Sequence, residues 1–170
     1  LGQVGEMNPM ATEHDKGDID VYIDTRKFAG GFATMAQGIN DMVAGHIGVK
    51  KKAMAVVRAF GEGDFDAPLE QFPGKKAFIN DTIEQVRANL RAVIADTSML
   101  VEAAAEGRLE VRADARAHRG GFADIVQGIN HTLDTVIGPL TEVARVLKAM
   151  EAGDLTQRIN ATYAGQLEDL

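Results

Sequence analysis

The stretch GGFATMAQGIN at residues 30–40 recurs as GGFADIVQGIN at residues 120–130, an offset of 90 residues. A second motif recurs through the chain and consists of glycine, then Asp or Arg, then an apolar residue. It begins at Gly17, Gly63, Gly107 and Gly153. A fixed period of this kind indicates that each repeat is one supersecondary unit and that the stack of units is the fold. The sequence therefore predicts an array of about four units, and helical arrays transmit or scaffold more often than they catalyse.

The composition favours helices and argues against several kinds of function. Ala, Val, Leu, Glu, Arg and Met are frequent and Trp is absent, which is typical of helical chains. The absence of Cys excludes disulfides and thiolate metal sites and suits a reducing compartment. The net charge of −7 argues against a nucleic-acid partner, and no apolar run approaches the ~18–20 residues of a membrane span. Because the chain opens at Leu1 without Met, we expect it to be an internal piece of a longer protein.

Three long helices are predicted by apolar residues that recur every seven positions. Such a spacing over roughly 29 residues is typical of a supercoiled helix seam rather than of a lone amphipathic helix. Each stretch carries two seams, and in the third stretch the first seam recurs 90 residues and the second seam 91 residues after its counterpart in the first stretch. The seams are Phe32, Ile39, His46, Ala53, Phe60 with Met35, Met42, Val49, Val56; Ile79, Val86, Val93, Leu100 with Ile83, Leu90, Thr97, Ala104; and Phe122, Ile129, Val136, Val143, Met150 with Val126, Leu133, Leu140, Leu147.

Each predicted helix ends at a glycine, and the chain then changes its period. Glycine just past a helix end takes the left-handed conformation without steric cost. Beyond the glycine, apolar and polar residues alternate, as in Ile19, Val21 and Ile23. These segments are too short for a sheet, so we predict extended connectors that lay apolar side chains along a helix bundle. The predicted helix-end glycines are Gly17, Gly63, Gly107 and Gly153, and the predicted connector clamps are Ile19, Val21, Phe65, Leu69, Leu109, Val111, Leu155 and Ile159.

The spacing of the motifs indicates two alternating types of unit. From each connector glycine to the following Ile-Asn dipeptide the distance is 23, 17 and 23 residues, so the second connector is shorter by six. From each Asn to the next glycine motif it is 23, 27 and 23 residues, and an insertion of four in a heptad array locally unwinds a supercoil. Pro139 interrupts the third helix, and Gly45 and Gly48 occupy the corresponding place in the first. We interpret both places as unit boundaries where two helices join with a bend; the alternative is one straight helix with a tolerated kink.

The segment from Pro139 through GDLTQRI at residues 153–159 resembles the first helix and connector of a HAMP domain, the signal-relay module of bacterial receptors and sensor kinases. The two GGF…QGIN segments and KKAFINDTI at residues 75–83 resemble the start of the second helix of that domain. The run of residues 49–90 is similar to the poly-HAMP segment of methyl-accepting chemotaxis proteins. Two features depart from the pattern: the second connector is short and contains Pro68 and Pro73, and GGF or PGKK replaces the acidic-x-Gly motif.

The resemblance implies an all-α fold of concatenated, parallel homodimeric four-helix coiled-coil bundles with extended connectors. The implied units are residues 1–47, 48–93, 94–137 and a truncated unit at 138–170. The implied function is non-enzymatic relay in the cytoplasm, in which alternative helix packings carry the state of an upstream sensor to a downstream output domain. The direct partner is a second copy of the chain. A histidine kinase and a coupling adaptor are expected only through the parent's downstream domain, and neither nucleic-acid binding nor membrane insertion is expected, although the parent is either soluble or anchored in the inner membrane.

No constellation of catalytic or metal-ligating residues stands out, and no cofactor is expected. His14, His46, His118 and His131 lack the spacing of a helical zinc site. His46 lies on a seam, where it either sets the register with a pH-dependent charge or is a partly solvated boundary residue. Lys50–Lys52 is interpreted as a solvated face rather than a membrane-binding patch. Two other functions stay open: a helical small-molecule sensor, which needs a cavity with convergent polar groups, and a passive spacer, which predicts unbroken heptads.

Overall fold

The computed structural model describes residues 2–168, and within them it contains helices and irregular segments but no strand. The predicted all-α class is therefore confirmed. The predicted helices are confirmed as well, since the seams at residues 32–60 and 122–150 fall inside two helices of 31 residues each. The α-helices are α1 (Gly2–Asp15), α2 (Gly31–Gly61), α3 (Phe78–Ala105) and α4 (Gly121–Glu151), and the short 3-10 helices are η1 (Thr25–Lys27), η2 (Gly74–Ala77), η3 (Ala115–Ala117) and η4 (Gly165–Leu167).

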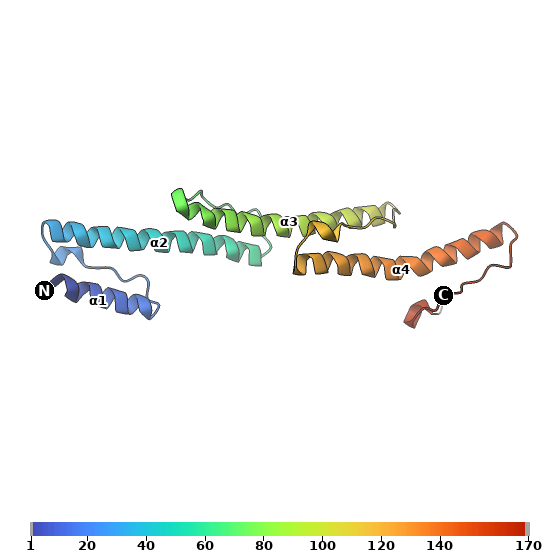
Figure 1. The fold of residues 1–170 in the computed structure, drawn as a ribbon, viewed down its shortest axis with the longest axis horizontal. Helices are drawn as coiled ribbons and strands as arrows, with labels where there is room; N and C mark the ends of the chain where they lie inside the picture. Colours follow the sequence, from blue (N-terminus) through green and yellow to red (C-terminus); the bar gives the residue numbers. More distant parts are fainter. Residues whose placement is uncertain (1, 169–170) are drawn as a thin grey trace. The chain divides into compact units, whose positions relative to one another are not determined.

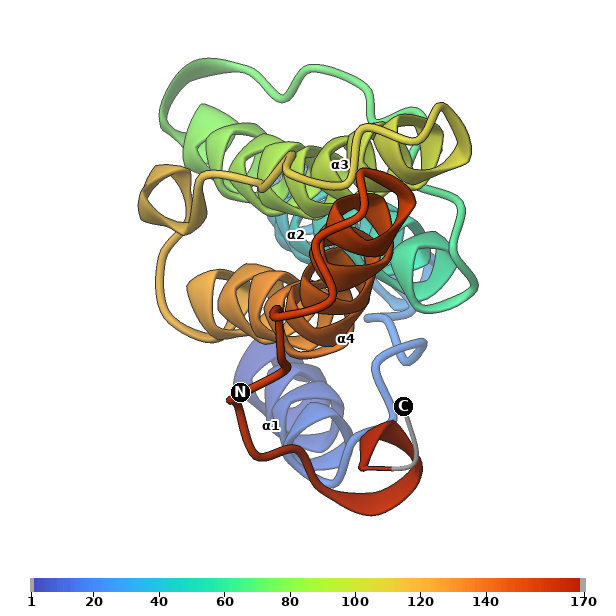
Figure 2. The same cartoon turned by 90° about the vertical axis from the view of Figure 1, so that its right-hand side faces the viewer.

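The structure divides after Arg87 into two parts, and each part is described by itself. In the first part, α1 and α2 lie side by side and run in the same direction, because the connector of residues 16–30 returns along them (Figure 1). In the second part, the end of α3 and the start of α4 form the same kind of parallel pair (Figure 1). The second connector, residues 62–73, runs alongside the start of α3 in both views (Figures 1 and 2). Each of the first three connectors thus joins two parallel helices.

Two buried clusters occupy the same positions of the repeat. In the first part Met10, Ile23 and Ala36 form one core. In the second part Leu100, Ala113 and Val126 form the other, and each of these lies 90 residues after its counterpart. Each core takes one residue from the first helix, one from the connector and one from the second helix. The sequence repeat is therefore also a repeat of packing, as expected when one supersecondary unit recurs.

The second connector packs differently from the first and third. Its Phe72 is almost completely buried, together with Val56 and Phe60 of α2 and Ile83 of α3. The Phe60 and Phe65 rings lie 5.9 Å apart between centroids and are tilted by 50°, a favourable aromatic arrangement. The first connector contributes Val21, Ile23 and Phe28 to its own core.

The long helices continue through the predicted boundaries. α4 runs without a break through Pro139, which is buried, and α2 runs through Gly45 and Gly48. The predicted interruption of the helix at Pro139 is therefore wrong. Proline removes only one backbone donor, and the helical hydrogen bonds on either side of it preserve the helix. The path of α4 nevertheless changes direction along its length (Figure 1), as expected of a helix that contains proline. The use of these places as unit boundaries stays a prediction.

Candidate functional site

The candidate functional site is the set of junctions between helices and connectors, which are built alike along the chain. At the end of α1 the Asp18 N–H donates to the Glu13 carbonyl at 2.9 Å, and the Gly17 N–H donates to the His14 carbonyl at 3.0 Å. This pair of bonds is a Schellman motif, which satisfies the last carbonyls of a helix. The same two bonds close α2, α3 and α4, and the glycines that make them possible have φ between 77° and 98°: Gly17, Gly63, Gly107 and Gly153.

An aspartate follows three of these glycines and turns the chain into the connector. The Asp64 side chain accepts a hydrogen bond from the Asp66 N–H at 2.9 Å, and the Asp154 side chain accepts from the Thr156 N–H at 2.9 Å. Hydrogen bonds from Thr156 and Gln157 lower the pKa of Asp154, since they favour its charged form. An Asx turn of this type fixes the first step of the connector through a local side-chain contact.

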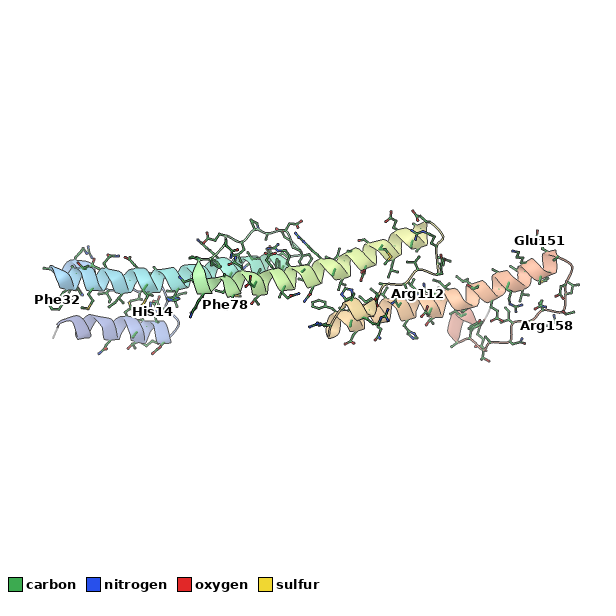
Figure 3. All side chains as sticks on the ribbon, turned by 45° about the horizontal axis from the view of Figure 1, so that its top comes forward. His14, Phe32, Phe78, Arg112, Glu151 and Arg158 are labelled. Carbon is green, nitrogen blue, oxygen red and sulfur yellow. The ribbon has the colours of Figure 1, made fainter. Side chains whose placement is uncertain are left out.

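The predicted connector clamps are buried to different depths within one chain. The first apolar residue after each of three glycines is exposed: Ile19 is 37% exposed, Leu109 39% and Leu155 67%. Figure 3 shows the last of these connectors turning back from Glu151 at the end of α4 toward Arg158. The remaining predicted clamps are half-buried, namely Val21, Phe65, Leu69, Val111 and Ile159. The deepest connector residues are Ile23, Phe72 and Ala113, which sequence reasoning did not select.

Three asparagines fasten the connectors, and sequence reasoning used them only as spacing markers. Asn130 accepts from the Ala113 N–H at 3.1 Å and donates to the Ala113 carbonyl at 2.8 Å. Asn40 makes the same two bonds to Ile23. Asn80 is buried and accepts from the Phe72 N–H but donates to the Glu70 carbonyl. The recurrence of Asn after Ile in each unit was the signal for this role, because an amide side chain can satisfy one donor and one acceptor of a buried backbone.

A second pair of glycines precedes the second helix of the first and third units. Gly30 has φ 57° and ψ −138° and Gly120 has φ 54° and ψ −139°, a region of conformation that is essentially restricted to glycine. Just before them, the Asp24 side chain accepts from the Arg26 N–H and pairs with the Arg26 guanidinium at 2.8 Å. The side-chain hydrogen bond from Arg26 lowers the pKa of Asp24, and Arg116 does the same for the pKa of Asp114. The GGF motif is therefore a structural turn.

Charged groups join connectors to helices in ways that differ between units. Lys51 pairs with Asp20 of the first connector at 2.9 Å, and Lys52 pairs with Glu70 of the second at 2.5 Å. Two residues of the predicted solvated lysine run thus contact two different connectors. In the second part, Arg112 of the connector pairs with Asp134 of α4 at 2.8 Å (Figure 3). Ion pairs that are open to solvent contribute little free energy individually.

Two histidines also hold connectors. His14 on α1 makes a contact of 2.8 Å from its Nε2 to the Val21 carbonyl (Figure 3). His118 has a side chain that is only 5% exposed, and its Nε2 lies 2.6 Å from the Asp96 Oδ2 on α3. Phe28 stands 90 residues earlier, where the first part uses an apolar residue instead. The sequence predicted neither contact. The partner of His118 lies 22 residues away, and the partner of His14 is a backbone carbonyl.

The described residues offer no cluster of side chains for metal binding. Among the side chains that the structure describes, no group of three or more His, Asp or Glu residues could hold a metal ion. The grooves found between connectors and helices are open, as the one lined by Lys52, Pro68 and Glu70 illustrates. Among the described helices, none combines the length and the hydropathy that crossing a membrane requires.

Comparisons with known proteins match three segments of the chain to one type of domain. A family model for the second HAMP domain of the methyl-accepting chemotaxis protein McpB matches residues 5–45. A model for HAMP N-terminal domain 3 matches residues 49–91, and the HAMP domain model matches residues 117–170. The methyl-accepting chemotaxis protein McpB of Pseudomonas aeruginosa is 34% identical over 151 residues, which are 86% of this chain and 22% of that protein. The chain therefore spans about a fifth of the length of this relative.

Parallel helix pairs, joined by returning connectors and repeated along one chain, define an array of helical repeats. The matches specify which one: the chain belongs to the HAMP family and carries several HAMP domains in series. The resemblance predicted from the sequence is thus confirmed. HAMP domains are non-catalytic signalling modules, so the prediction that the chain is not an enzyme is confirmed through its family.

Proposed function

We propose that this chain relays a conformational signal as a parallel homodimer, in which each HAMP unit forms a four-helix bundle with its counterpart in a second copy. The observation that carries the proposal is an apolar face that one chain leaves uncovered. Met35 and Met42 are 52% and 58% exposed although they lie on a predicted heptad seam. Burying the exposed half of each such side chain is favourable by roughly 1 kcal/mol, so a partner with the same seam would stabilise the pair.

The direction of the helices supports a parallel partner. Within each part the two helices of a unit run the same way (Figure 1), so two copies aligned in register bring four parallel helices together. The second part has exposed apolar residues of its own on α4, namely Ile125, Leu140, Leu147 and Met150. Four-helix bundles use apolar seams of this kind as their core. The same surface on both copies forms the symmetric interface expected of a homodimer.

The signal in this proposal is a change of packing between these helices. Methionines on the uncovered face tolerate several packings because their side chains are flexible and unbranched. The connector clamps then set which packing is preferred. Replacing Leu109 or Phe65 with Ala is expected to bias the output state of an intact receptor. Unchanged output in both variants would count against a relay role for these two side chains.

The proposal also covers the setting of the chain. The matched relative is named a methyl-accepting chemotaxis protein, so we place this segment in a chemotaxis receptor on the cytoplasmic side, between a sensor and an output domain. A histidine kinase and a coupling adaptor would be contacted only by the output domain. We keep unit boundaries at residues 47/48, 93/94 and 137/138, the last of them just before Pro139.

Disulfide cross-linking tests the homodimer, because the chain contains no Cys. Met35→Cys and Ile125→Cys are placed at exposed, repeat-equivalent positions. Each variant should form a disulfide-linked dimer by itself, and a mixture of the two should give no 35–125 product. Gln37→Cys is the matched control, because it lies about 200° around the helix from residue 35 and should cross-link poorly.

Two results would overturn the proposal. A 35–125 product as the main species would show that the two copies run in opposite directions. Equal cross-linking at residues 35 and 37 would show that the apolar face is not the interface. Either result would leave the chain a HAMP array without the proposed parallel bundle.

A further inference from the structure

A buried arginine holds the second connector against α3. The Arg87 side chain is only 8% exposed, which is unusual because arginine is almost never fully buried unless it is paired. Its Nη2 donates to the Ala67 carbonyl at 2.7 Å, and its Nη1 donates to the Phe65 carbonyl. Its Nε donates to the Glu84 carboxylate at 2.9 Å. The guanidinium therefore binds two connector carbonyls and one carboxylate at the same time.

The same guanidinium also lies against the aromatic residues of this unit. Its central carbon is 5.0 Å from the centroid of the Phe60 ring, within the range of a cation–π interaction. Phe60 in turn packs on Phe65, whose carbonyl Arg87 binds. One planar group thus links α2, the connector and α3 in a single cluster, and the donors of arginine are arranged as a rigid fork that suits this geometry.

The repeat shows that this arginine is specific to one unit. Arg87 follows Asn80 by seven residues, and the residues seven positions after Asn40 and Asn130 are Ile47 and Ile137. Ile47 is buried and Ile137 half-buried. At this register, two units use an apolar side chain and the unit with the short connector uses a cation. Isoleucine can slide over its neighbours without losing a hydrogen bond, whereas arginine cannot leave the two carbonyls without leaving them unpaired.

We infer that Arg87 is a latch that fixes the second connector on α3, so that this unit repacks less readily than the units with isoleucine at the same register. The inference rests on the proposed relay function only for its consequence in signalling. The fixing of the connector is a property of the chain itself. In a relay, a fixed connector makes the second unit a stiff link that passes on the state of its neighbour.

Hydrogen exchange of the whole chain, followed by mass spectrometry, tests the latch. Arg87→Met keeps an unbranched apolar stem but removes the guanidinium and its donors. Amides of residues 62–73 should then exchange about tenfold faster or more. Arg87→Lys should not restore the protection, because a single ammonium cannot bind both carbonyls as the fork does. Arg58→Met, at an exposed position of α2, is the matched control and should leave exchange in residues 62–73 unchanged.

The third connector provides an internal reference. In Arg87→Met, exchange of residues 108–120 should stay as in the unchanged chain. Two results would overturn the proposed role of Arg87. Equally faster exchange in both connectors would indicate general destabilisation, and unchanged protection of residues 62–73 in Arg87→Met would show that the arginine does not hold the connector. None of these readings requires a receptor. If cross-linking refuted the parallel dimer while Arg87→Met still released residues 62–73, the relay proposal would fail and the latch would stand.

Discussion

Asn40 makes two hydrogen bonds to the backbone of a single residue, Ile23: its Oδ1 accepts from the Ile23 N–H at 2.9 Å, and its Nδ2 donates to the Ile23 carbonyl at 2.8 Å. These bonds fix the depth of the first connector against α2, because Ile23 carries the side chain that enters the core. Asn130 repeats this geometry on Ala113, whereas Asn80 divides its two bonds between Phe72 and Glu70 of the shorter connector. The connectors are therefore held by backbone hydrogen bonds at one point and by unit-specific contacts elsewhere.

Replacing Asn40 with Ala should lower the free energy of unfolding by about 1–3 kcal/mol, because it leaves a partly buried N–H and carbonyl unpaired. Urea unfolding followed by circular dichroism measures the change. Gln37→Ala is the control, since Gln37 is an exposed amide on the same helix and its loss should cost much less. Equal effects of the two substitutions would refute the role of Asn40 as an anchor.

Neighbouring glycines at the start of α2 should respond in opposite ways to alanine. Gly30 has φ 57° and ψ −138°, so Gly30→Ala should destabilise the chain by roughly 1–3 kcal/mol. Gly31 is helical, and a Cβ there meets nothing within 4 Å. Gly31→Ala should therefore be neutral or stabilise by roughly 0.4–1 kcal/mol. Thermal unfolding of both variants is the measurement, and destabilisation by Gly31→Ala would point to a contact that one chain does not contain.

The helix ends allow a second matched comparison. Gly63 has φ 87° and Gly61 is the last residue of α2. Gly63→Ala should cost about 1–2 kcal/mol, the penalty of the left-handed conformation for an L-residue. Gly61→Ala places a good helix former in a helix and should not destabilise. Chemical unfolding distinguishes the two, and a neutral Gly63→Ala would mean that the Schellman motif does not determine where α2 ends.

The Asp24–Arg26 pair predicts a pH dependence with a definite sign. The hydrogen bond from Arg26 lowers the folded-state pKa of Asp24. The pair therefore contributes to stability above the ordinary Asp pKa of about 3.9. The contribution is lost as the pH falls through the lower folded-state pKa. An NMR titration of the Asp24 carboxyl should give a midpoint below about 3.9, and Arg26→Gln should move it upward. An unchanged midpoint in Arg26→Gln would contradict the pairing.

The sequence alone determined the helices, the connector positions and the family. These features depend on local signals: seams of period seven mark helix faces, and a glycine marks each helix end wherever a left-handed residue is needed. The seam from Phe32 to Phe60 predicts α2 to within a residue at each end. The repeat of 90 residues anticipates that Met10, Ile23 and Ala36 have counterparts in a second core, although it does not say which residues enter that core.

The tertiary structure alone decided which connector residues carry the contacts. Alternation along a connector marks an apolar edge but not its depth, so Ile19 and Ile23 look equivalent in sequence while one is exposed and the other buried. Asn40 and Arg87 look like ordinary polar residues of helices, yet one anchors a backbone 17 residues away and the other 20 and 22 residues away. Burial and hydrogen bonding of this kind depend on neighbours brought together by folding, and no local pattern encodes them.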